Sequence, residues 1–204
     1  MQAGPLLEIK PVTLTGQVVR LEPLSQAHLE DLTEAGADAG IWEFMVYGDL
    51  SKPGAMRAWV DYMLDLQKRG ADLPFAVVLR ASDRAIGATR FMEIRPAHRA
   101  LEIGGTWYAT AYQRTAVNTE CKYLMLEHAF ERLGCMRVQF KTDARNLRSQ
   151  RALERIGAVK EGVLRQHMIL PDGYRRDSVY YSILDREWPG IKKRLEAMLA
   201  SNRL

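Results

Sequence analysis

A long helical stripe that directly follows a series of strand-like runs constrains the fold of this chain most. Between Val117 and Leu133 apolar side chains recur near helical spacing, and Gly134 follows where a helix would end. Turn signals separate the strand-like runs before it, which predicts an antiparallel meander. These runs are residues 73–80, 86–94 and 101–109. We therefore expect a sheet together with a long, well-buried helix.

Similar signals predict the other elements. Alternation indicates a first strand, and Ser25 then stands where the N-cap of a helix is expected. The sequence Pro171-Asp172-Gly173 is a strong turn signal and predicts a hairpin. Apart from the meander and the long helix, the predicted elements are a strand at 17–23, helices at 25–37 and 53–69, a strand at 137–141, a helix at 146–156, hairpin strands at 163–170 and 178–184, and a last helix after 189.

An aromatic segment, Ile41 to Gly48, lies between the first two predicted helices. Packing of Trp42 and Phe44 in the core would explain it, and so would contact with a substrate. The sequence leaves both interpretations open.

Length and composition indicate one domain. The chain has 204 residues, of which 47% are hydrophobic, so we expect a single domain over 1–204, with its core at about 17–185 and a C-terminal helix at about 189–201. Its net charge of +4 is spread along the chain, which disfavours nucleic-acid binding. Two isolated cysteines and scattered histidines predict no metal site and favour a reducing compartment. Without a signal peptide or a long apolar run, we expect a cytoplasmic protein that does not contact a membrane.

The third strand of the meander carries a carboxylate opposite an apolar set. Strict alternation places Glu102, Gly104, Thr106 and Tyr108 on one face. The other face then holds Leu101, Ile103, Gly105 and Trp107.

The segment LEIGGTWYATAYQRTAVNTECKYLMLEHAFERLGCMRVQFKTDARNLRSQRALERIGAVKEG, residues 101–162, resembles GNAT-superfamily acetyltransferases. The branch is the one similar to ribosomal-protein-alanine N-acetyltransferases. This resemblance implies an α/β fold of the α+β type, with a mixed, mostly antiparallel sheet of about seven strands flanked by helices. It also implies acetyl-CoA as cosubstrate, an amine as acceptor, and a homodimer as one assembly that relatives often form.

One pattern behind the resemblance is the entry into the long helix. In relatives this entry has Gln or Arg, then two variable residues, Gly, one variable residue, and finally Gly or Ala. At the two positions where relatives have these small residues, this chain has Ala116 and Asn118. Unpaired N–H groups at a helix N-terminus can hold the pyrophosphate of coenzyme A. Arg114 either adds a charged contact or projects into solvent. The resemblance implies cofactor binding by Trp107, Tyr108, Ala109, Gln113, Arg114, Thr115, Ala116, Val117, Asn118, Thr119, Asn146 and Ser149.

The second pattern is the short helix that begins near Asn146 and ends at Gly157. Asn146 matches the family residue that meets the pantetheine arm, although a plain N-cap is the alternative. Many relatives protonate the leaving thiolate with a Tyr on this helix, and the matching position here is Leu153. The branch resemblance makes Ser149 the candidate acid, with a simple helix residue as the alternative.

Acetyl transfer also needs a base and a donor to the oxyanion. Glu102 is the candidate base, with a structural Glu or His167 as alternatives, and a backbone N–H near Tyr108 and Ala109 is the candidate donor. We expect direct attack by a primary amine in a ternary complex, the amine being a protein N-terminus, an amino acid, a polyamine or an aminoglycoside. The alternative function is an inactive acyl-CoA-binding regulatory module.

Overall fold

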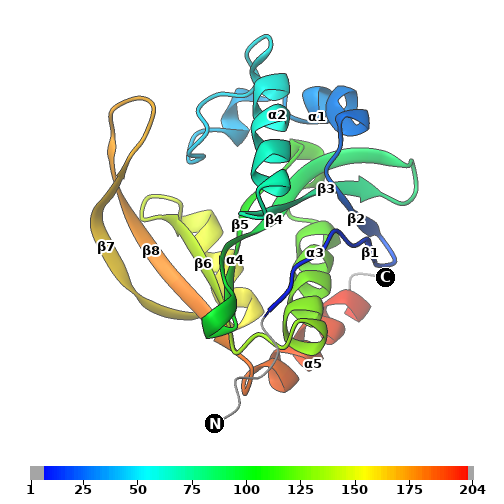
Figure 1. Cartoon of the computed structure of the whole chain (residues 1–204), viewed down its shortest axis with the longest axis vertical. Coiled ribbons are helices and arrows are strands. Elements are labelled where there is room, and N and C mark those ends of the chain that lie inside the picture. Colours follow the sequence, from blue (N-terminus) through cyan, green and yellow to red (C-terminus); the bar gives the residue numbers. More distant parts are fainter. Residues whose placement is uncertain (1–6, 202–204) are drawn as a thin grey trace.

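The computed structural model describes residues 7–201, and these form one mixed sheet with helices on both of its faces (Figure 1). Within these residues the sheet has eight strands in the order β1-β2-β3-β4-β5-β6-β8-β7. Only β5 and β6 are parallel neighbours, and the other pairs are antiparallel. The strands are β1 Leu14–Thr15, β2 Val19–Pro23, β3 Leu73–Leu79, β4 Arg84–Arg95, β5 Ala100–Tyr108, β6 Arg137–Asp143, β7 Val159–Ile169 and β8 Arg175–Leu184. The predicted number of about seven is exceeded because the two-residue strand β1 extends the sheet.

The helices agree in place with those that the sequence predicts. They are α1 Leu29–Ala35, α2 Ala55–Lys68, α3 Ala116–Glu127, α4 Leu147–Ile156 and α5 Trp188–Ser201. The final turn of the long helix widens into a π-helical turn over His128–Arg132, so α3 is shorter than its apolar stripe. Among residues 7–201, no helix has both the length and the apolar character needed to span a membrane.

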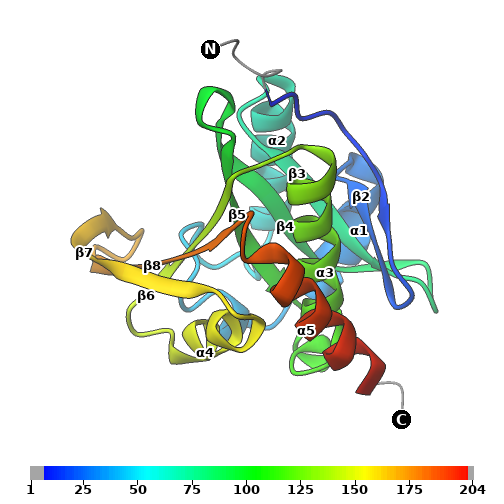
Figure 2. The same ribbon diagram turned by 90° about the horizontal axis from the view of Figure 1, so that it is seen from below.

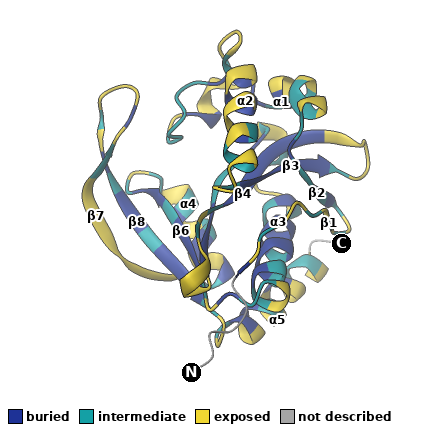
Figure 3. Cartoon of the chain, viewed as in Figure 1, coloured by how far each residue is buried: buried dark blue, intermediate teal, exposed yellow. Residues whose placement is uncertain are grey.

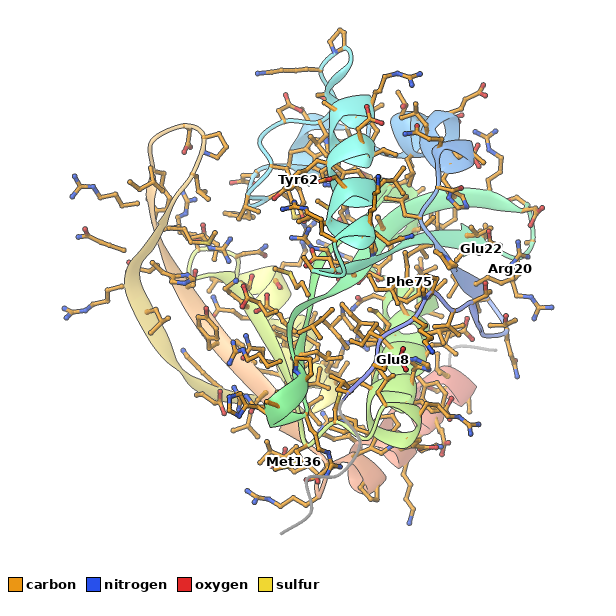
Figure 4. The ribbon with its side chains drawn as sticks, viewed as in Figure 1. Glu8, Arg20, Glu22, Tyr62, Phe75 and Met136 are labelled. Atoms are coloured by element: carbon orange, nitrogen blue, oxygen red, sulfur yellow. The ribbon has the colours of Figure 1, made fainter. Side chains whose placement is uncertain are left out.

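The two faces of the sheet are covered by different helices (Figure 2). Phe75 and Val77 of β3 point to a core that α3, α4 and α5 complete, whereas their neighbours Ala76 and Val78 point to a second core under α1 and α2. Buried residues accordingly follow the central strands and the inner side of α3, while β7 is largely exposed (Figure 3). Figure 4 shows Phe75 between the layers and Tyr62 on the outside of α2.

Strands β5 and β6 pair only at their beginnings. Ala100, Leu101 and Glu102 lie opposite the first three residues of β6, and no pairing follows beyond Glu102. Strand β5 continues along β4 as far as Tyr108, while β6 continues along β8. The sheet therefore opens into a wedge whose closed end lies at Glu102 and whose open end lies at Tyr108.

A β-bulge at Gly105 overturns the predicted alternation along β5. Trp107 pairs with Ala88 and Gly104 pairs with Arg90, so β5 contains one extra residue, and Gly105 has a φ of +59°. One inserted residue exchanges the faces of all residues beyond it. Trp107 therefore joins the face of Glu102 and packs in the core under α2. Thr106 and Tyr108 turn to the face of α3, together with Leu101 and Ile103.

Candidate active site

The N-terminus of α3 lies at the open end of the wedge. Tyr108, the last residue of β5, donates its hydroxyl proton to Asn118 Oδ1 at 3.2 Å, and Lys122, one turn further along α3, bonds to Thr106. The helix therefore runs back along β5 from the open end. Thr115 caps it by accepting a bond from the Val117 N–H at 3.3 Å. The remaining N–H groups of the first turn have no intrahelical partner, which suits an anion.

Gln113 connects the two sides of the open end. Its Nε2 donates to the carbonyl oxygen of Tyr108 at 3.3 Å, and its Oε1 accepts a bond from Arg148 Nη1 at 2.6 Å. Arg148 belongs to the first turn of α4. The entry loop of α3 and the start of α4 therefore meet where the sequence patterns predict the cofactor.

Other residues of the predicted cofactor loop divide between surface and interior. Arg114 is exposed and adopts a left-handed backbone conformation with φ of +61°, and Ala116 is half-buried. Val117 packs in the core, and Thr119 is buried and accepts a bond from Arg155 at 3.2 Å. The side chains of Val117 and Thr119 thus face the interior, which leaves backbone groups as their means of binding a cofactor.

Of the two predicted oxyanion donors, only one has a free N–H. Ala109 donates its N–H to the carbonyl oxygen of Ile86 at 2.8 Å. Ladder bonds alternate along an antiparallel strand, so the N–H and C=O of Tyr108 point away from β4 and into the wedge. This orientation explains why the Tyr108 carbonyl receives the bond from Gln113. The backbone of Tyr108 therefore remains the candidate donor, and Ala109 does not.

The start of α4 is fixed by Asn146. Its Oδ1 accepts a bond from the backbone N–H of Ser149 at 2.9 Å, which is the N-cap contact named as the alternative to cofactor binding. Ser149 is half-buried in the first turn, and its hydroxyl is not part of this cap. Leu153 is buried in the core, so its side chain takes no part in the site. Ser149 stays the candidate acid.

Glu102 lies at the closed end of the wedge with only 1% of its surface exposed. Its carboxylate accepts a bond from Gln139 Nε2 at 2.9 Å and lies 3.5 Å from Lys141 Nζ. Both partners belong to β6 and share its face with Asp143, opposite Phe140 of the core. A carboxylate held in this position can serve as a general base for an incoming amine.

His167, the competing base, lies in the β7–β8 hairpin. Its Nδ1 is 3.0 Å from Ser178 Oγ, and its Nε2 is 3.4 Å from the Tyr180 hydroxyl. Burial lowers the pKa of His167, and the positive charges of Lys141 and Arg176 lower it further. The imidazole is therefore neutral at neutral pH and lies on the same polar face as Glu102.

The family profile decides which class of protein this site belongs to. Residues 19–159 match the family described as Acetyltransferase (GNAT) domain. The chain belongs to the GNAT acetyltransferase family. Its predicted family and fold class are thereby confirmed, and that family is one of acyltransferases that use acetyl-CoA.

Individual GNAT relatives agree with this placement. The Bacillus subtilis protein named "Putative ribosomal N-acetyltransferase YdaF" is 36% identical over 95 residues, which are 47% of this chain and 51% of that protein, so the chain spans about half of its length. A GCN5-related N-acetyltransferase from Brucella melitensis superimposes with a TM-score of 0.89 and 31% identity, covering 96% of this chain and 88% of its own. RimJ of Mycobacterium smegmatis, solved with CoA-disulfide, shares the fold, with a TM-score of 0.76, 24% identity and coverage of 98% and 94%. This GNAT chain thus resembles the branch of ribosomal-protein acetyltransferases.

In the aromatic segment of this GNAT chain, the packing interpretation holds for Trp42, while substrate contact stays a prediction. Trp42 is core: it is 3% exposed, donates its Nε1–H to the Gly36 carbonyl and packs 4.9 Å from Trp107. Phe44 instead reaches the polar side of the sheet, where the Arg145 guanidinium lies 5.6 Å from its ring. The same guanidinium lies 3.5 Å from the ring of Tyr174 at the hairpin tip. The segment and the hairpin thus meet over the face that holds Glu102.

Sequence reasoning missed Lys122, although it interrupts the apolar stripe of the long helix. Lys122 is 5% exposed, and its Nζ donates to Thr106 Oγ1 at 2.8 Å and lies 5.9 Å from the Phe140 ring. Burial lowers the pKa of this ammonium to about 8. Thr106 and Phe140 belong to the two diverging strands, so the GNAT wedge has a lysine on its α3 side. A charged residue inside an apolar helical stripe is the signal that could have revealed it.

Proposed function

We propose that this protein transfers the acetyl group of acetyl-CoA to a primary amine by direct attack in a ternary complex. The observation that carries the proposal is the wedge between β5 and β6. It offers an unpaired edge of β5 for an extended pantetheine arm, with a helix N-terminus at its open end and a buried carboxylate at its closed end.

The residues at the open end fit the diphosphate of the cosubstrate. The first turn of α3 supplies N–H groups, and the helix dipole favours negative charge there. Glu120 does not oppose this binding, because its carboxylate is turned toward the β1–β2 connection and is bonded there. The structure of RimJ with CoA-disulfide supports coenzyme A as the ligand of this fold.

Glu102, at the closed end, accepts a proton through water from the ammonium form of the acceptor, and the freed nitrogen lone pair attacks the thioester carbonyl carbon. The N–H of Tyr108 stabilises the oxyanion of the tetrahedral intermediate. As this intermediate collapses, the C–S bond breaks and Ser149 gives a proton to the thiolate of coenzyme A. The nitrogen loses its extra proton to water, and Ser149 recovers a proton from water. The products are an acetamide and the free thiol.

The acceptor is an amine of a protein N-terminus or of a small molecule. YdaF, whose name refers to ribosomal N-acetylation, supports a protein α-amine as the first acceptor class to test. Incubation of a cell extract with labelled acetyl-CoA, followed by mass spectrometry, identifies which molecules gain the label.

Thiol release from acetyl-CoA tests the reaction itself. With a panel of peptides, amino acids and small amines, at least one acceptor should release coenzyme A in step with formation of an acetamide. Calorimetry of coenzyme A binding is the parallel measurement. Binding without turnover on the whole panel would contradict the enzyme and support a regulatory module.

A further inference from the structure

A buried arginine on the polar face of the sheet has no partner within the chain that the structure describes. Arg176 of β8 is 4% exposed, and among residues 7–201 its side chain makes no hydrogen bond or salt bridge. Its Nε atom is wholly buried and unpaired. Burying a guanidinium without a hydrogen-bonding partner is costly, so native structures rarely leave one in this state.

Neighbouring charges on this face are already paired. Arg145 Nη2 is 3.0 Å from an Asp143 oxygen, and Arg90 Nη1 is 2.9 Å from Asp72. Asp143 also accepts bonds from the backbone N–H and the Nε–H of Arg145, so both of its oxygens are bonded to Arg145. Among the described residues of this face, Arg176 by contrast has no carboxylate within salt-bridge distance.

The strand register places Arg176 on the face that holds the candidate base. Val179 and Tyr181 of β8 point into the core, so Arg176 and Ser178 point to the opposite, polar face. Ser178 pairs with Asp143 of β6 and bonds to His167. Burial lowers the pKa of Arg176, while the negative charges of Asp143 and Glu102 oppose that shift, which indicates that both carboxylates lie near it.

The chemistry of a guanidinium indicates what it binds. Its planar fork matches a carboxylate with two parallel N–H···O bonds, and it stays protonated throughout the physiological range. We propose that the acceptor amine carries a carboxylate group, which Arg176 binds while Glu102 receives the proton from the amine. This inference rests on the proposed acetyl transfer, and it disfavours polyamines and aminoglycosides, whose cations would face an unpaired arginine.

Two sources can supply the same carboxylate. A free amino acid carries it beside the amine, and a peptide carries it on an acidic N-terminal side chain. Matched acceptors separate the two: glutamate against its α-amide, and peptides that begin with Glu against the same peptides that begin with Gln.

The first test uses the unaltered protein, so it does not depend on a variant that folds. For at least one of the two pairs, kcat/KM should be about 10- to 100-fold higher for the carboxylate acceptor, which is the range of a hydrogen bond to a charged group. The pair that shows this preference identifies whether a free amino acid or a peptide side chain supplies the carboxylate. Equal kcat/KM within both pairs overturns the inference, while turnover of any amine leaves the proposed function intact.

The second test uses Arg176→Gln, with Arg175→Gln as its matched control. Arg175 is adjacent on β8 but exposed, and its side chain lies on the other face. Arg176→Gln should remove the preference for the carboxylate member of the pair, and Arg176→Lys should retain part of it. Arg175→Gln should behave as the parent. Equal losses with carboxylate and amide acceptors would assign Arg176 a structural role and overturn the inference.

Product binding gives a readout that does not need turnover. In calorimetry of the coenzyme A complex, N-acetylglutamate should bind at least about 10-fold more tightly than its diamide, as expected for one charge-assisted contact. Arg176→Gln should remove this difference while coenzyme A affinity stays within twofold of the parent. Equal affinities for the two products would overturn the inference even if acetyl transfer itself were absent.

Discussion

The Glu120 carboxylate fills the space beside Gly16 that any other residue there would need for its Cβ. A Cβ built on Gly16 would lie 2.4 Å from Glu120 Cδ. The carboxylate accepts the backbone N–H groups of Gln17, Val18 and Val19 at 2.7–2.8 Å. A single side chain of the candidate anion-binding helix α3 thereby bonds to the turn between the first two strands of the sheet.

Glu120→Gln should lower the free energy of unfolding by about 1–3 kcal/mol, because an amide nitrogen would face backbone donors that a carboxylate oxygen accepts. Urea denaturation of the two proteins measures the difference. Glu43→Gln is the control, since Glu43 is exposed. Equal losses of unfolding free energy from both substitutions would show that the three bonds to the backbone add nothing to stability.

Gly105→Ala should damage both the bulge and the site. Its φ of +59° is strained for alanine, and the added Cβ would lie 2.6 Å from the Tyr47 hydroxyl and 3.1 Å from Arg90 Nε. Gly70→Ala is a matched control with a φ of +68° and no atom within 4 Å of the added Cβ. The left-handed conformation costs each variant roughly 1–2 kcal/mol. Thermal melts should show a larger loss for Gly105→Ala, and equal melting temperatures would argue against tight packing around the bulge.

Glu102→Gln should lower turnover at neutral pH by roughly 10²- to 10⁴-fold, the usual contribution of a general base, while the Kd of coenzyme A changes little. Gln can still accept the bond from Gln139, which keeps the local structure. Glu93→Gln on the neighbouring strand is the control, because Glu93 is exposed. Initial rates and calorimetry provide the two readouts, and parental kinetics in Glu102→Gln would remove this residue from the mechanism.

Ser149→Ala should lower kcat by roughly 10²-fold if the hydroxyl protonates the thiolate, without loss of stability. The reason is that the N-cap of α4 uses the backbone N–H of Ser149 and not its hydroxyl. Asn146→Ala is the converse control: it removes the cap and should cost about 1 kcal/mol of stability. An unchanged kcat in Ser149→Ala, measured under saturating acetyl-CoA, would leave thiolate protonation to another group.

Lys122→Met should make the protein more stable at neutral pH and change its pH dependence. The pKa of Lys122 lies at about 8 in the folded state, below the ordinary value of 10.5, so the folded protein releases this proton first as the pH rises. The free energy of unfolding of the parent therefore rises by roughly 3 kcal/mol in total as the pH increases from 8 to 10.5. Below pH 8 the lysine is charged in the folded protein, and the full cost of burying that charge is present. Denaturation of both proteins across this window should show their difference shrinking as the pH rises, and a constant difference would contradict the shifted pKa.

Local signals predicted most elements because they depend on short-range backbone geometry. Asn146 caps α4, and Gly157 ends it in a left-handed conformation with φ of +96°, as expected for a short helix bounded by these two residues. The alternation rule failed on β5 because an inserted residue such as Gly105 can be recognised only from the register of the neighbouring strand. The functional assignments of Glu102 and Ser149 depended on resemblance, and they stay predictions.

The sequence by itself determined the order of the main strands and helices, both ends of α4, and membership of the GNAT family, since hydrophobic period, caps and family motifs are written in consecutive residues. Only the tertiary structure decided that Trp107 turns to the core under α2, that Glu120 binds residues about a hundred positions away, and that Arg176 is buried without a partner. Burial and charge pairing depend on which distant segments meet in space, and a linear pattern does not contain that information.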